Sequence, residues 1–128
     1  MTQTILYIED NPDNMMLVER AIEALGHRFL WAADGAKGLE LAEAERPDLI
    51  LLDINLPDID GYEIAQRLRA VGEHGNGQGH LLHVPIIAVT ANALKGDAEK
   101  ALAAGCSSYM AKPISTRELR RQVQMILA

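Results

Sequence analysis

Cysteine is scarce in this chain: Cys106 is the single one among 128 residues, which excludes an internal disulfide. Cys106 stands at an expected turn into a strand, and we interpret it as a small buried thiol. Long hydrophobic runs are also missing, since none approaches the roughly 18–20 residues of a membrane-spanning helix. The N-terminus lacks the charged and apolar segments of a signal peptide. We therefore expect a cytoplasmic protein that does not associate with membranes.

Basic residues are fewer than acidic residues in this chain. The chain has 12 Lys and Arg against 18 Asp and Glu, which gives a net charge of −6. A surface that binds nucleic acid needs clustered Lys and Arg. The one basic cluster, formed by Arg117, Arg120 and Arg121, is better explained as the solvated face of the last helix. The composition therefore argues against nucleic acid as a partner.

Apolar runs and helical patterns alternate five times along the chain. The expected strands cover residues 4–9, 28–33, 48–53, 85–90 and 107–111. The expected helices cover residues 13–25, 35–45, 61–71, 94–104 and 115–127. Most strand runs are almost continuously apolar, as in a parallel sheet that helices cover on both faces. We predict an α/β fold: one doubly wound, five-stranded parallel sheet in the flavodoxin-like order 2-1-3-4-5, with five helices. We expect one domain over residues 1–128 and no output domain.

Carboxylates follow two of the expected strands. Glu9 and Asp10 come directly after the first strand, and Asp53 comes at the end of the third. The carboxyl ends of parallel strands meet at one edge of the sheet, so these carboxylates should converge and repel one another. A Mg²⁺ ion would remove that repulsion. We expect Asp10 and Asp53 as direct ligands, Glu9 as a direct or water-mediated ligand, and Asn55 as a ligand through its backbone carbonyl.

Asp53 is the candidate nucleophile, because a carboxylate can form a covalent aspartyl phosphate. Phosphoryl transfer then depends mainly on positioning and on stabilising charge on three equatorial oxygens. Mg²⁺ would bind one oxygen, and the Lys112 ammonium a second. Thr90, at the end of the fourth strand, would offer its hydroxyl to the third oxygen beside the Ala91 backbone N–H. Taken alone, Thr90 is better explained as an ordinary β-branched strand residue.

The dipeptide Lys112–Pro113 follows the last strand. A lysine aimed into a site needs a sharp turn, and X–Pro bonds adopt the cis form at modest cost. We therefore predict a cis peptide bond between Lys112 and Pro113. Tyr109, on the same strand, could move between a buried and an exposed position, although a half-buried strand aromatic explains it equally well.

In combination, these residues resemble the receiver domain of bacterial two-component response regulators. The matching landmarks are Glu9-Asp10-Asn11, Asp53-Ile54-Asn55-Leu56-Pro57, Asp60-Gly61, Pro85-Ile86-Ile87-Ala88-Val89-Thr90-Ala91 and Lys112-Pro113. The resemblance covers the whole chain. Two further stretches are similar to the DivK group of single-domain regulators, namely Asp10-Asn11-Pro12-Asp13-Asn14-Met15 and Lys112-Pro113-Ile114-Ser115.

The resemblance implies a phosphorylation cycle. A histidine kinase or a histidine phosphotransfer protein would donate a phosphoryl group to Asp53, with Mg²⁺ as cofactor and no turnover of a metabolite. Thr90 and Tyr109 would then move and change the surface formed by the fourth helix, the fifth strand and the fifth helix, which would control a downstream protein. Asn55 and Asn92 would influence the lifetime of the phosphate. The chain would be a monomer or a weak homodimer.

One stretch departs from the family pattern. Residues 72–80 carry four glycines and make a longer link between the third helix and the fourth strand than is usual in the family. We expect a mobile, exposed loop. It could be a contact for a specific partner or a tolerated insertion, and we favour the insertion.

Three other functions compete with this one, and the first of them would have the same fold. A protein-binding module could work without phosphate, but such proteins usually lose an acidic residue or the lysine, and this chain keeps all five: Glu9, Asp10, Asp53, Thr90 and Lys112. An aspartate-dependent phosphatase usually needs a cap domain, for which 128 residues leave no room. A nucleotide or flavin protein would show a glycine-rich loop after the first strand, and residues 10–13 contain no glycine.

Overall fold

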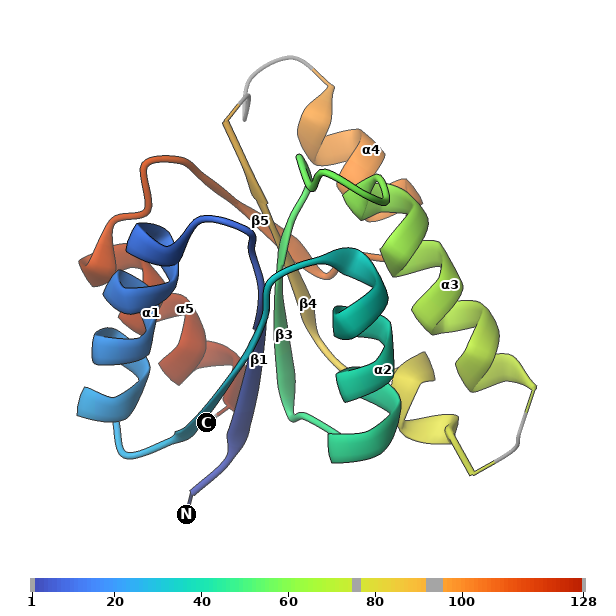
Figure 1. The fold of residues 1–128 in the computed structure, drawn as a ribbon, viewed down its shortest axis with the longest axis horizontal. Helices are drawn as coiled ribbons and strands as arrows, with labels where there is room; N and C mark the ends of the chain where they lie inside the picture. Colours follow the sequence, from blue (N-terminus) through green and yellow to red (C-terminus); the bar gives the residue numbers. More distant parts are fainter. Residues whose placement is uncertain (1, 75–76, 92–95, 128) are drawn as a thin grey trace.

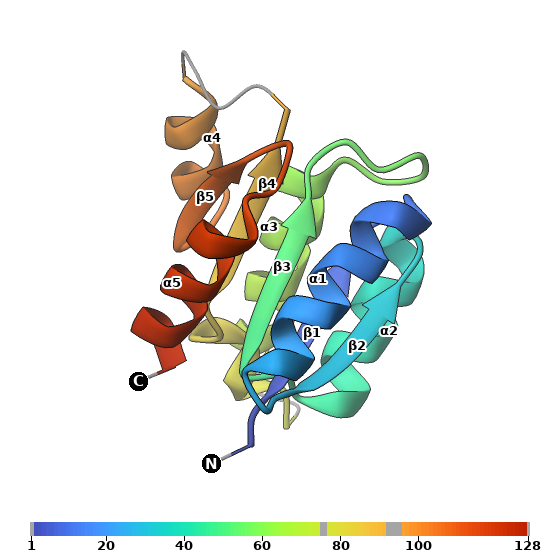
Figure 2. The same cartoon turned by 90° about the vertical axis from the view of Figure 1, so that its left-hand side faces the viewer.

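Five parallel strands form one sheet in the order β2-β1-β3-β4-β5, with helices on both faces (Figures 1 and 2). The computed structural model describes residues 2–74, 77–91 and 96–127. The strands are β1 (Thr4–Ile8), β2 (Arg28–Ala32), β3 (Leu49–Asp53), β4 (Ile86–Thr90) and β5 (Ser108–Ala111). The helices are α1 (Pro12–Ala24), α2 (Gly35–Glu45), α3 (Gly61–Glu73), α4 (Asp97–Ala103) and α5 (Thr116–Leu127), with a 3₁₀ helix η1 (Gly79–Leu82). The predicted strand order is confirmed.

The alternation of side chains along each strand explains why both faces are covered. On β1, Ile5 and Tyr7 belong to the core beneath α1 and α5, whereas Leu6 and Ile8 belong to the core beneath α2, α3 and α4. All four side chains are fully buried. A strand that is apolar on both faces cannot lie at a solvated surface, so the sheet forms the middle of three layers.

The register of the sheet brings the strand ends level with one another. Ile8 pairs with Leu52, Asp53 pairs with Val89, and Thr90 pairs with Ala111. The residues at or just after these ends therefore emerge at the same edge. This edge is the carboxyl end of all four strands, where open parallel sheets bind their ligands.

The link between α3 and β4 differs in part from the predicted mobile, exposed loop over 72–80: residues 73, 74, 77 and 79 are exposed, but residue 72 is buried in α3 and residues 79–80 belong to η1. Helix α3 continues to Glu73, and the buried Gly72 packs against η1. A Cβ atom at Gly72 would lie 2.6 Å from the backbone nitrogen of Leu82, so only glycine permits this approach. Leu81 of η1 is fully buried in the core. The prediction was wrong at Gly72, because a glycine-rich composition also suits a close contact between two backbones.

Arg69 of α3 fastens this link to the rest of the domain. Its guanidinium donates hydrogen bonds to the carbonyl oxygens of Leu81 (2.9 Å), Val84 (2.7 Å) and Gly105 (2.7 and 3.0 Å). Burial lowers the pKa of Arg69 from its usual value. One side chain thus satisfies three backbone carbonyls that β-sheet pairing does not reach.

Cys106 lies next to this arginine contact and is 5% exposed. Burial raises the pKa of its thiol to about 11, although the nearby Arg69 opposes the shift. A reactive thiol needs a lowered pKa and exposure. The interpretation of Cys106 as a small buried thiol is therefore confirmed.

The helices of the described part of the chain are short. The longest, α1 and α3, have 13 residues each. Within residues 2–74, 77–91 and 96–127, no helix combines the length and the apolar character needed to cross a membrane.

Candidate functional site

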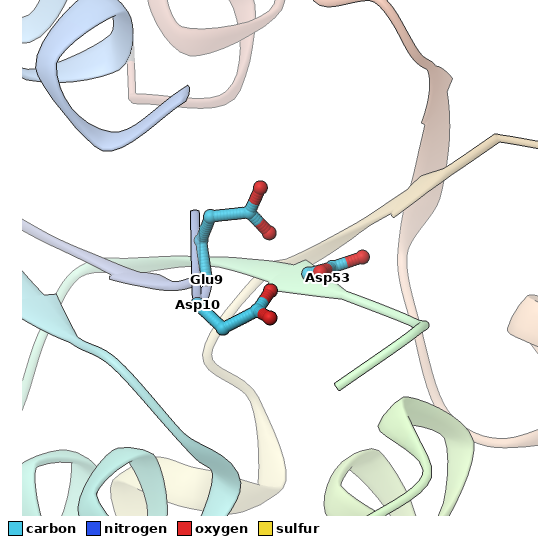
Figure 3. A group of neighbouring side chains, drawn as sticks. All are labelled: Glu9, Asp10 and Asp53. Carbon is cyan, nitrogen blue, oxygen red and sulfur yellow. The ribbon is translucent and has the colours of Figure 1, made fainter. Parts of the chain in front are cut away.

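Three carboxylates converge at the carboxyl edge of the sheet, as Figure 3 shows. Glu9 and Asp10 follow β1, and Asp53 is the last residue of β3; one oxygen from each lies within 4.8 Å of the others. Glu9 and Asp53 are buried, whereas Asp10 is exposed. Mg²⁺ is bound in proteins by one or two carboxylates together with water and phosphate oxygens. The cluster therefore fits a divalent cation that remains accessible from solvent.

Burial governs the protonation of Glu9. Its side chain has no exposed surface, and desolvation, reinforced by the hydrogen bond and the charge of Asp53, raises its pKa to about 7. The hydrogen bond from Asn14 and the charge of Lys112 act in the opposite direction. Without a cation, burial and the neighbouring Asp53 carboxylate therefore disfavour the ionised form of Glu9.

Lys112 follows β5 directly and reaches the acidic cluster from the end of that strand. Its Nζ lies 3.0 Å from Asp53 Oδ1 and 3.4 Å from Glu9 Oε1. Burial disfavours the charged ammonium, but the hydrogen bonds and charges of these two carboxylates outweigh burial and raise the pKa of Lys112. The Lys112 backbone N–H donates to the Thr90 carbonyl oxygen at 2.8 Å, and the Lys112–Pro113 bond is cis. A fixed positive charge thus lies beside the candidate nucleophile.

Thr90 ends β4 at the same edge and is 3% exposed. Its hydroxyl donates to Asp97 Oδ2 at 3.2 Å, and Asp97 is the first residue of α4. Ala91 follows Thr90 and is exposed. The hydroxyl that was predicted to meet a phosphoryl group therefore contacts helix α4 in this structure.

The remaining predicted residues lie at different places. The Asn55 backbone N–H donates to Asp53 Oδ1 at 3.1 Å, and its side chain is exposed. Tyr109 lies on β5, where it pairs with Ala88 and is 40% exposed, so it does not join the acidic cluster. Asn92 lies outside the described residues.

Two side chains that the sequence analysis did not select contact Glu9. The Asn14 side-chain amide donates to Glu9 Oε1 at 2.5 Å, and the Trp31 indole donates to the Glu9 carbonyl oxygen at 2.6 Å. A signal for Asn14 exists in the sequence: with Asn11 as helix cap, Asn14 falls at the third helical position, whose side chain can reach back past the cap. For Trp31 no local signal exists, because it lies on a different strand.

Asp58 fixes the loop that follows β3. Its carboxylate accepts hydrogen bonds from the backbone N–H groups of Gly35 (2.9 Å) and Ala36 (3.0 Å), at the start of α2. The hydrogen bond from Gly35 is the main cause that lowers the pKa of Asp58. The loop that carries Asn55 is thereby tied to the N-terminus of a helix, where a carboxylate is favourable.

Replacing Asp58 with alanine is expected to lower the free energy of unfolding by about 1 kcal/mol, as for the loss of a helix cap. Because the folded pKa of Asp58 is lowered, its contribution is present above its ordinary pKa of 3.8 and is lost as the pH falls through the lowered value. Urea unfolding at neutral and acidic pH measures both effects. Glu43→Ala, on the exposed face of α2, is the matched control; an equal loss in both variants would contradict the prediction.

Comparison with known proteins agrees with this geometry. The family model of the response regulator receiver domain matches residues 5–124. The polar-differentiation response regulator DivK of Brucella anthropi is 43% identical over 115 residues, which cover 90% of this chain and 88% of that protein. The receiver domain of a sensor histidine kinase from Pseudomonas aeruginosa PAO1 is 43% identical, with a TM-score of 0.85 and full coverage of both chains. Its crystal structure holds a magnesium ion in the active-site cleft.

More distant structures share the fold. The chemotaxis response regulator CheY4 of Vibrio cholerae superimposes with a TM-score of 0.88 at 23% identity, covering 98% of this chain and 99% of that one. At that identity the likeness concerns the architecture alone.

Proposed function

The chain belongs to the response regulator receiver domain family, whose members act in two-component signalling and not in metabolism, and from this membership we propose that it accepts a phosphoryl group on Asp53 with the help of Mg²⁺. One observation carries the proposal. The buried Asp53 carboxylate lies within a cluster of three acids and has the Lys112 ammonium 3.0 Å from its Oδ1. Such a combination of cation site, nucleophile and fixed positive charge suits phosphoryl transfer.

The proposed step is a displacement at phosphorus. A carboxylate oxygen of Asp53 forms a bond to the phosphorus of a phosphohistidine, and the phosphorus–nitrogen bond breaks. The electron pair of that bond stays with the imidazole of the donor, so the donor histidine is regenerated. The donor would be a histidine kinase or a histidine phosphotransfer protein.

The chain's own residues would stabilise the transferred group. Lys112 would bind one phosphoryl oxygen through its ammonium, and Thr90 with the Ala91 backbone N–H would bind another. Glu9, Asp10, Asp53 and the Asn55 carbonyl would hold Mg²⁺. When bound, Mg²⁺ supplies charge neutralisation for a third phosphoryl oxygen and for the acids. The magnesium ion in the cleft of the Pseudomonas receiver domain supports this assignment.

Thr90 would transmit phosphorylation to the surface. Its hydroxyl donates to Asp97 at the start of α4, so movement toward a phosphoryl oxygen would release a hydrogen bond to that helix. Tyr109, 40% exposed on the adjacent β5, would follow. The surface of α4, β5 and α5 would then change its affinity for a downstream protein. Asn55 and Asn92 would set how long the phosphate persists.

The test is intact mass spectrometry after incubation with acetyl phosphate. We expect a single phosphoryl-sized gain in mass with Mg²⁺, and no gain after removal of Mg²⁺ with a chelator. Asp53→Asn is the control variant, because it keeps the shape of the side chain and removes the nucleophile.

A folded protein that binds Mg²⁺ but shows no gain in mass would contradict the proposal. It would favour the phosphorylation-independent binding module of the same fold. A gain that persists in Asp53→Asn would place the phosphoryl group on another residue.

A further inference from the structure

Asn14 reaches back from the first turn of α1 to the end of β1. Its Nδ2 donates to Glu9 Oε1 at 2.5 Å. Glu9 has no exposed surface, so bulk water cannot readily replace this donor, and a buried polar group that loses its partner is penalised. The amide of Asn14 is therefore part of the environment that orients the Glu9 carboxylate.

Asn11 in turn fixes Asn14. Its Oδ1 accepts hydrogen bonds from the backbone N–H groups of Asp13 (2.8 Å) and Asn14 (3.1 Å), and Pro12 occupies the first helical position. A capped first turn with proline has little freedom. The segment from Glu9 to Asn14 is thus held by local hydrogen bonds. Asn11 caps α1 directly after the end of β1, and Asn14, in the first turn of α1, donates to Glu9.

Lys112 also lies near Glu9, with its Nζ 3.4 Å from Oε1 and 3.5 Å from Oε2. These distances are long for a charge-assisted hydrogen bond, and Lys112 is nearer to Asp53, at 3.0 Å. In the proposed reaction Lys112 turns to a phosphoryl oxygen. A neutral amide is suited to hold Glu9 in that state, because it orients a carboxylate without adding positive charge that would repel a cation.

We propose that Asn11 and Asn14 are positioning residues for Mg²⁺ binding: Asn11 sets the first turn of α1, and Asn14 holds Glu9 Oε1 so that Oε2 is directed to the cation or to its water. This inference rests on the proposed function, since it assigns roles at the same site. Hydrogen-bond partners of metal-binding carboxylates commonly change metal affinity by about 10- to 100-fold when they are removed.

Mg²⁺ affinity, measured by calorimetry and by fluorescence, tests the proposal independently of activity. Trp31 is the only tryptophan, and its indole donates to the Glu9 carbonyl oxygen at 2.6 Å, so its emission reports on this end of β1. Asn14→Leu keeps the size of the side chain and removes the donor. We expect it to weaken Mg²⁺ binding by about 10-fold or more.

The Asn11 variants test the second step. Asn11→Ala removes the cap and should weaken Mg²⁺ binding, whereas Asn11→Ser keeps an acceptor for the first turn and should restore most of the affinity. These variants also provide a test if Asn14→Leu fails to fold. Met16→Ala, which alters an exposed side chain of the same helix, is the control and should leave the affinity unchanged.

The Mg²⁺ dependence of phosphorylation by acetyl phosphate distinguishes a positioning role of Asn14 from a general loss of structure in the variant. For Asn14→Leu, the half-saturating Mg²⁺ concentration should rise, while the maximal rate stays close to that of the unmodified chain, because Asp53 and Lys112 are intact. Unchanged Mg²⁺ affinity in a folded Asn14→Leu would overturn the role of Asn14 and leave the proposed function standing. Equal affinities for Asn11→Ser and Asn11→Ala would overturn the role of Asn11. If the unmodified chain does not bind Mg²⁺ at all, the proposed function itself fails.

Discussion

Replacing Lys112 with methionine is expected to slow the phosphorylation of Asp53 by about 100-fold or more, the usual effect of removing one preorganised charge from a transition state. Mg²⁺ binding should stay as tight or become tighter. The reason is that Lys112 lies 3.0 Å from Asp53 and 3.4 Å from Glu9, so its removal leaves the acids more negative. A fall in rate without a fall in metal affinity would identify Lys112 as a partner of the phosphoryl group.

Both quantities should be measured on the same samples, the rate by the increase in phosphorylated mass and the affinity by Mg²⁺ titration. Removing one member of a buried ion pair destabilises a protein, so the rates are compared at saturating Mg²⁺, where the cation replaces the lost charge. Lys100→Met, at an exposed position on α4, is the matched control. A Lys112→Met variant that reacts at the unmodified rate would show that Lys112 only neutralises the acids.

The sequence was sufficient to predict the sheet and the placement of the acids for a simple reason. Runs such as Leu49–Asp53 are buried on both faces, and only a parallel sheet between two helical layers accommodates several such runs. Once the strands are parallel, their carboxyl ends are level, so Glu9, Asp10 and Asp53 must meet. The apolar pattern of each strand and the topology of the whole sheet then predict the same position for the three acids.

The contacts that could not be predicted join residues far apart in the chain. Arg69 bonds to Gly105, 36 positions later, and Asp58 bonds to the start of α2, 23 positions earlier. A single charged residue on a helix or in a loop belongs to no periodic pattern, so the sequence does not indicate which residue it will contact. Gly72 was also assigned incorrectly, because its glycine-rich neighbours suggest a loop, whereas it lies in α3 and packs closely against Leu82.

The start of the fourth helix was also placed differently. The pattern predicted a helix over 94–104, whereas α4 is described from Asp97 to Ala103, with Gly96 at φ +82° before it. Residues 94–95 lie outside the described part of the chain. A glycine in the left-handed region is compatible with the start of a helix but not with its interior, so α4 begins after Gly96.

Replacing Glu9 with glutamine is expected to stabilise the metal-free protein above neutral pH and to weaken its response to Mg²⁺ strongly. Burial, followed by the hydrogen bond and the charge of Asp53, raises the pKa of Glu9 from 4.5 to about 7. Ionised Glu9 is therefore unfavourable in the folded state unless a cation is bound. Glutamine does not ionise, and its amide oxygen can still accept the hydrogen bond from Asn14.

The pH dependence follows from the raised pKa. The folded state holds the proton of Glu9 more tightly than the unfolded chain, so the unmodified protein loses stability as the pH rises from about 4.5 through about 7. Below this window the two proteins should differ little, and above it the advantage of Glu9→Gln should be complete. Urea unfolding without Mg²⁺ at several pH values across the window measures the difference. Glu43→Gln, at an exposed position, should show no such trend.

In the presence of Mg²⁺, the unmodified protein should gain more stability than Glu9→Gln. Binding displaces the proton from Glu9, so the Mg²⁺ affinity of the unmodified protein should fall about tenfold for each pH unit below the pKa of Glu9. The affinity of Glu9→Gln should be weak and much less dependent on pH in this range. A variant that binds Mg²⁺ as tightly as the unmodified protein would remove Glu9 from the metal site. If both the stability and the Mg²⁺ affinity depend on pH in this way, Glu9 destabilises the metal-free fold and is also needed to bind the cation. Such a loss of stability in exchange for function is expected at a functional site.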